Sequence, residues 1–139
     1  MLDTNIFNRV LDGKFALSAL SGSSFVATKV QLEELNHTSD QVRRTMLLQK
    51  FKEIGPDIVP ASFSFDIAGA GFGEGTWSKD DDAQKLHAAL EALRSRFNNW
   101  HDALIAEAAF VHGCGLVTAD EDLAAVAKTH GLTVYHVTT

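Results

Sequence analysis

The chain has 139 residues, of which 45% are hydrophobic, and it carries a formal charge of −6. This composition suits one ordinary domain rather than a disordered chain, so we predict a single domain over residues 1–139, and the negative charge counts against a broad nucleic-acid surface. The single cysteine, Cys114, excludes an internal disulfide, and without an apolar run of roughly 18 residues or a basic leader we expect a cytoplasmic protein with no membrane contact.

Short apolar runs alternate with amphipathic segments through the first half of the chain, which is typical of an α/β domain. The predicted elements are a strand over 1–2, a helix over 4–11, a strand over 24–28, a helix over 30–36, a helix that begins at a capping box of Thr38 and Gln41 and ends at Gly55, and a strand over 57–60. Val42, Met46 and Phe51 are expected to form the core-facing stripe of the longest of these helices.

The second half continues the alternation after a glycine-rich stretch. The predicted elements are a helix begun within 61–67, a loop over 69–75, a helix capped by Ser78 or Asp80 with the stripe Leu86, Leu90, Leu93 and Phe97, a helix over 100–112 capped by Asn98 or Asn99, a strand over 116–118, a helix over 121–130 and a strand over 133–137. Residues 69–75 have little side chain to pack, so we predict a mobile loop that becomes ordered on binding a partner. A tight ordered turn is the alternative. The elements together predict an α/β fold with a mostly parallel sheet.

Acidic residues stand in apolar sequence at four predicted strand ends or on the helices beside them. They are Asp3, Glu34, Asp102 and Asp120. A lone carboxylate is costly to desolvate unless it is paired or binds a cation, and Mg²⁺ and Mn²⁺ prefer oxygen ligands of this kind. Because sites in open parallel sheets form beyond the carboxyl ends of the strands, Asp3 and Asp120 should meet there. The pattern therefore predicts a site for Mg²⁺ or Mn²⁺, which commonly serves phosphoryl-transfer chemistry.

Each of these residues also has an ordinary structural role that the sequence leaves open. Asp3 and Asp120 can cap the helices that follow them. Asp102 can act only electrostatically at the start of its helix, and Glu34 can be a solvated helix residue.

Neighbouring residues are predicted either to support this site or to have ordinary roles. Asn5 can fix its neighbours by hydrogen bonds. Thr118 can orient a metal ligand or a phosphate, or it can form a capping box with Glu121. Asp122 is either an outer carboxylate or a charge at a helix N-terminus. Glu33 and Glu107 are expected in solvent rather than as ligands. His101 is expected at the surface or packed, with a proton carrier as the alternative, and Trp100 and Phe97 are expected in the core, with stacking on bases as the alternative. The basic residues are expected on solvated helix faces, with an RNA-binding track as the alternative; they are Arg43, Arg44, Lys50, Lys52, Arg94 and Arg96.

Four short motifs carry the acids in a fixed order. They are Asp3-Thr4-Asn5 after the first strand, Glu34-Leu35 with Thr28 ahead of it, Asp102 to Ala106 at a helix start, and Thr118-Ala119-Asp120 after a buried strand. In this order and at this spacing they resemble the PIN domain, a family of metal-dependent nucleases. The resemblance implies an α/β/α sandwich with a mostly parallel central sheet of four to five strands. It implies Asp3, Asp102 and Asp120 as metal ligands, and Glu34 as a ligand or as the group that orients the attacking water.

In detail the chain resembles the toxins of VapBC-type bacterial toxin–antitoxin pairs. This implies an endoribonuclease that depends on Mg²⁺ or Mn²⁺, acts on RNA, forms a homodimer and is neutralised by a cognate antitoxin. A standalone PIN protein of RNA maturation and a catalytically silent interaction module are the alternatives. A phosphatase of the HAD type is disfavoured because that family needs a second Asp where this chain has Asn5.

Overall fold

The computed structural model describes residues 1–20, 22–61, 81–96 and 98–138. Several predicted features therefore lie outside the described residues. They are the helix expected to begin within 61–67, of which only residue 61 is described, the glycine-rich loop over 69–75, the caps Ser78 and Asp80, and Phe97.

Short parallel strands form the middle layer. Strand β1 (Val26–Ala27) pairs with β2 (Asp57–Ile58), and β3 (Leu116–Thr118) pairs with β4 (Val134–His136), both in parallel. Residues 1–3 lie between the two pairs. The Leu2 N–H donates to the Val26 carbonyl at 3.0 Å, and the Val117 N–H donates to the Met1 carbonyl at 2.8 Å. The predicted parallel sheet is confirmed, although it is small.

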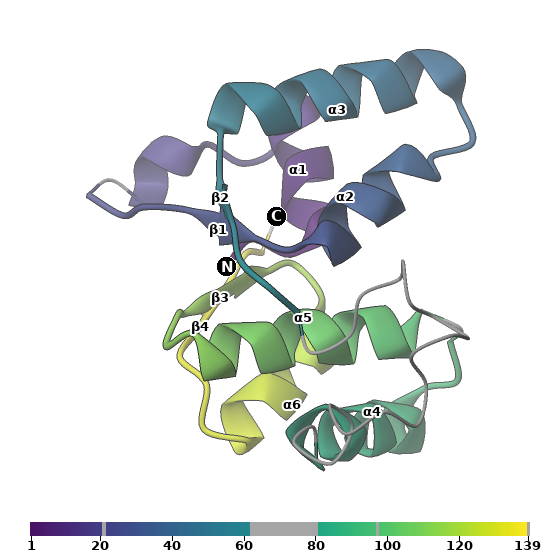
Figure 1. The fold of residues 1–139 in the computed structure, drawn as a ribbon, viewed down its shortest axis with the longest axis vertical. Coiled ribbons are helices and arrows are strands. Elements are labelled where there is room, and N and C mark those ends of the chain that lie inside the picture. The colour runs from purple at the N-terminus through teal and green to yellow at the C-terminus, as the bar shows by residue number, and fades with distance from the viewer. Residues whose placement is uncertain (21, 62–80, 97, 139) are drawn as a thin grey trace.

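Helices cover both faces of this layer (Figure 1). On one side lie α1 (Thr4–Leu11), α2 (Lys29–Asn36) and α3 (Gln41–Ile54), and on the other α4 (Asp81–Leu93), α5 (Asn99–Val111) and α6 (Glu121–Thr129), with a 3₁₀ turn over Leu17–Leu20. Residues of the sheet contribute side chains to two hydrophobic cores, one on each face. Leu2 and Val137 pack with α1 and α3, whereas Met1 and Leu116 pack with α5 and α6. The mixed α/β fold is as predicted. None of the helices among the described residues is both long and apolar enough to cross a bilayer.

Helix α3 differs from its predicted pattern in two ways. Its N-cap is Asp40, whose carboxylate accepts from the Arg43 N–H at 3.0 Å, rather than Thr38. Val42 and Met46 are 70% and 49% exposed, so the predicted core-facing stripe is wrong in its first turns. The helix packs through Leu47 and Phe51 instead, and it ends as expected at a left-handed glycine, Gly55.

Two further expectations about burial are wrong. The predicted stripe of α4 holds at Leu86 and Leu90, but the helix ends at Leu93, whose side chain is 58% exposed. Glu107 was expected in solvent and is 2% exposed, because α5 lies in the middle of the helical layer and is buried on nearly every face. The capping box that does form is that of Thr28 with Gln31 at the start of α2.

Candidate active site

Two of the predicted acids stand where neighbouring sheet segments end. Asp3 is the last residue of the segment over residues 1–3 and the N-cap of α1, and Asp120 lies two residues after the end of β3 and is the N-cap of α6. Both capping roles that the sequence left open are therefore present. The Asp120 carboxylate accepts from the Leu123 N–H at 3.1 Å through Oδ1, and its Oδ2 accepts from Arg94 Nη1 at 2.5 Å.

Asp3 is only 2% exposed, and its carboxylate accepts hydrogen bonds from three donors. Its Oδ1 accepts from the Thr4 N–H at 2.8 Å, and its Oδ2 accepts from Asn5 Nδ2 at 3.1 Å and from the Thr118 hydroxyl at 2.6 Å. Burial raises the pKa of Asp3 to about 6, the Thr118 hydroxyl lowers it, and the charge of Glu34 raises it further.

Asn5 and Thr118 join Asp3 to the turn that carries Asp120. Thr118 Oγ1 accepts from the Asp120 N–H at 3.0 Å, and Asn5 Oδ1 accepts from the Ala119 N–H at 3.1 Å. Thr118 is fully buried and is not the N-cap of α6, so the capping box with Glu121 is absent. Both residues therefore connect Asp3 to the turn of Asp120 by hydrogen bonds, and their role as supporting groups of a site stays a prediction.

Glu34 reaches the same place from α2. Its Oε1 accepts from the Thr4 hydroxyl at 2.5 Å, and its Oε2 lies 3.2 Å from His101 Nδ1. The Glu34 side chain is 16% exposed, so it is not the solvated helix residue of the alternative interpretation. His101, which was expected outside the site, is in direct contact with it.

Asp102 lies in the first turn of α5 and is 5% exposed. Burial raises its pKa to about 8, and the charges of Asp3 and Glu34 add to that rise, while Arg94 opposes it. Asp120 raises the pKa of Asp102 as well. The four predicted acids are thus close enough for each to interact electrostatically with another.

Arg94 is the group that the sequence did not place in this site. It follows the last residue of α4, and its side chain is 7% exposed rather than solvated. Its Nη2 lies 2.5 Å from Asp102 Oδ2 and its Nη1 2.5 Å from Asp120 Oδ2. Asp122 Oδ2 stands 3.7 Å from the same Nη1, so Asp122 is an outer carboxylate of the cluster. Arg96, by contrast, is 57% exposed, as expected.

The donor set suits a divalent ion in its chemistry but not in its present arrangement. Carboxylate oxygens are the ligands that Mg²⁺ and Mn²⁺ prefer. Yet among the residues that the structure describes, no three His, Cys, Asp or Glu side chains are grouped so as to hold a metal ion. In this arrangement the guanidinium of Arg94 contacts one oxygen of Asp102 and one oxygen of Asp120.

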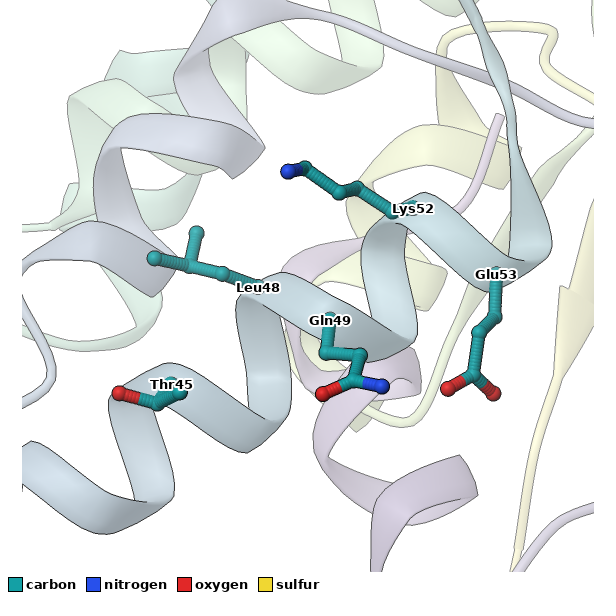
Figure 2. A pocket seen from close by; sticks show the side chains of 5 residues that line it. All are labelled: Thr45, Leu48, Gln49, Lys52 and Glu53. Atoms are coloured by element: carbon teal, nitrogen blue, oxygen red, sulfur yellow. The ribbon is translucent and has the colours of Figure 1, made fainter.

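A separate hollow lies along α3 (Figure 2). Its described lining residues are Thr45, Leu48, Gln49, Lys52 and Glu53. None of the predicted site residues lines it. The nearby basic residue Arg43 is engaged by Asp12, at 2.9 Å, and does not form part of an open basic track.

Comparisons with known proteins agree with this architecture. The PIN domain family matches residues 76–129, the segment that carries Asp102 and Asp120. Among solved structures, a domain of a functionally unknown protein from Methanocaldococcus jannaschii DSM 2661 is similar over 99% of this chain and 89% of that one, with a TM-score of 0.53 and 16% identity. At that identity the likeness concerns the fold alone. No curated protein matches the chain. Fold and matched segment together define a PIN-like α/β protein, and the PIN match indicates a nuclease.

Proposed function

We propose that this protein is an endoribonuclease that depends on Mg²⁺ or Mn²⁺, with Asp3, Asp102 and Asp120 as metal ligands and Glu34 at the attacking water. The PIN match supports the nuclease class. The observation that carries the proposal is the gathering of Asp3, Asp102 and Asp120, with Glu34, at one rim of the sheet, where Asp3 and Asp102 are buried. The pKa of Asp102 is raised to about 8 although a guanidinium lies against it. A rim of this kind gains from a further cation.

The residues of the chain have separable roles in this proposal. A divalent ion held there would activate water and offset the charge of a phosphodiester. Thr118 and Asn5 hold Asp3 in one rotamer, so that the carboxylate is aimed before any ligand arrives. Thr4 and His101 hold the two oxygens of Glu34 in the same way, which fixes the orientation of a base or water-orienting group.

The test is cleavage of single-stranded RNA with Mg²⁺ or Mn²⁺, with and without chelator. Asp3→Asn should abolish cleavage, whereas Asp57→Asn should cleave like the wild type, because Asp57 is an exposed carboxylate on β2. Cleavage that persists in chelator, or in Asp3→Asn, would contradict the proposal.

We further propose that the biological role is that of the toxin in a toxin–antitoxin pair, acting in the cytoplasm as a homodimer. An acidic pocket in a chain of charge −6 is electrostatically suited to a basic tail of an antitoxin. Expression of the wild type should arrest growth, Asp3→Asn should not, and co-expression of a neighbouring antitoxin gene should restore growth. Cleavage without growth arrest would instead favour a standalone protein of RNA maturation.

A catalytically silent interaction module is the second candidate. It is favoured by one observation, the guanidinium of Arg94 between Asp102 and Asp120 where a metal ion would need their oxygens. In that case the acids and Arg94 are a buried structural ion-pair network. Calorimetric titration with Mn²⁺ separates the two candidates, because a silent module of this kind binds no divalent ion at the rim.

A further inference from the structure

The backbone and the guanidinium of Arg94 are each held by hydrogen bonds where α4 meets α5. Its backbone N–H donates to the Leu90 carbonyl at 2.9 Å and so continues the last turn of α4. Its Nε donates to Asn99 Oδ1 at 2.9 Å, and Asn99 Nδ2 donates to the Arg94 carbonyl at 3.1 Å. Asn99 is fully buried and also donates to Glu91 at 3.1 Å. The guanidinium is therefore held in place by a built support rather than by attraction to the acids alone.

The two terminal nitrogens of Arg94 then meet two separate carboxylates. Nη2 contacts Asp102 and Nη1 contacts Asp120, each through Oδ2 and each at 2.5 Å. The planar fork of a guanidinium suits this bridging role better than a lysine ammonium. Asp3, by contrast, accepts from neutral donors of the described residues, namely Thr4, Asn5 and Thr118. The positive charge of the rim is thus concentrated on the α5 and α6 side.

A divalent ion bound through Oδ2 of Asp102 or Asp120 would need the oxygens that Arg94 already contacts. Such an ion would have to displace the hydrogen bonds of the Arg94 nitrogens, because like charges in a buried site repel. We propose that Arg94 is an internal counter-cation that competes with the divalent ion for Asp102 and Asp120, so that metal binding requires the guanidinium to leave. This inference rests on the proposed metal-dependent function and concerns the regulation of that same site.

The competition makes the free protein bind metal more weakly than its acids alone would allow. Because Asn99 anchors the Nε and the backbone, the guanidinium can leave only by breaking that support as well. Removal of the charge should therefore tighten metal binding and should also remove the cation on which the metal-free fold depends.

The experiment is calorimetric titration of the full chain with Mn²⁺. Arg94→Gln removes the charge, and we expect it to bind Mn²⁺ on the order of tenfold more tightly than the wild type. Arg96→Gln is the matched control, because Arg96 is 57% exposed and its Nη1 stands 4.0 Å from Asp120. It should change the affinity less than about twofold. Arg94→Lys keeps a cation without the bridging fork, so its affinity should lie between those of the wild type and Arg94→Gln.

Thermal melting supplies a readout that needs no activity. Without metal, Arg94→Gln should melt below the wild type, and saturating Mn²⁺ should raise its melting temperature by more than it raises that of the wild type. If the wild type binds Mn²⁺ and neither Arg94 variant binds it more tightly, the competition is refuted while the proposed function stands. If no variant binds Mn²⁺ or is stabilised by it, the metal-dependent function fails and the competition fails with it.

Discussion

Replacement of Thr118 by valine tests how strongly the site depends on a single buried hydroxyl. Thr118 Oγ1 donates to Asp3 Oδ2 at 2.6 Å and accepts from the Asp120 N–H at 3.0 Å. Removal of a hydrogen bond to a charged acceptor costs about 1.5–3 kcal/mol, and a buried N–H left without a partner adds a similar amount. The two effects overlap, so we expect Thr118→Val to lower the free energy of unfolding by about 3 kcal/mol. For a chain of this size that corresponds to a melting temperature about 10 °C lower.

The loss should also depend on pH, because part of it belongs to an ionised Asp3. The Thr118 hydroxyl lowers the pKa of Asp3 against the effect of burial, and that pKa is about 6. Without the hydroxyl the pKa of Asp3 rises further, so the destabilisation should be larger at pH 8 than at pH 5. Urea unfolding at both pH values measures this difference. The matched control is Thr129→Val, whose hydroxyl only back-bonds to the Ala125 carbonyl at 3.0 Å on an exposed turn of α6. The reasoning would be refuted if Thr118→Val lowered the free energy of unfolding equally at both pH values, or if Thr129→Val lowered it as much as Thr118→Val does.

The remaining predictions concern charge and packing. The folded-state pKa of Asp102, about 8, lies above the ordinary value of 3.8, so its stabilising contribution is full below about pH 4 and is lost as the pH rises to about 8. Between these two pH values, ionisation of the Asp102 carboxyl in the unfolded state lowers the free energy of unfolding by about 1.4 kcal/mol per pH unit. In urea unfolding without metal, the free energy of unfolding of Asp102→Asn should therefore rise relative to that of the wild type between pH 5 and pH 8.5. A difference in free energy of unfolding that stays constant over this range would contradict the pKa shift. Leu90→Ala should cost about 2–5 kcal/mol because Leu90 is fully buried, whereas Leu93→Ala should cost less than about 1 kcal/mol because Leu93 is 58% exposed. Equal losses would mean that α4 continues into the core beyond its observed end.

The order of the elements and the meeting of the acids could be predicted because both follow from local rules. Apolar runs next to helix caps locate strand ends, and parallel strands end at one rim, which brings Asp3 and Asp120 together. The buried position of Thr118 between them follows from the same turn. What the sequence could not decide was whether these aspartates cap helices or face the rim. The structure shows that the Asp120 carboxylate does both, because Oδ1 caps α6 and Oδ2 contacts Arg94 at the rim.

The burial of individual side chains could not be predicted, because it depends on which face of a helix its neighbours cover. Val42 and Met46 fit a helical stripe, but α3 lies on the outside of its layer and turns them to solvent. Glu107 lies on a helix that is covered on nearly all sides. The signal for Arg94 was present but weak: a basic residue at the end of one helix, five residues before the buried Asn99 that receives its Nε. Only the packing of α4 against α5 and α6 turns that residue toward the acids.

A rim that carries several acids must remain folded before any metal arrives, and Arg94 bears on that requirement. Without a cation the charges of Asp3, Glu34 and Asp120 would all act on the buried Asp102. Arg94 lowers the pKa of Asp102 but does not bring it back to its ordinary value, since burial and the other acids outweigh one guanidinium. Arg94 therefore offsets part of the effect of the acids on Asp102, and Arg96 stands 4.0 Å from Asp120 as well. Under the proposed competition, the negative charge that Arg94 does not offset is what would attract a divalent ion to the rim, and release of the guanidinium is what would oppose its binding.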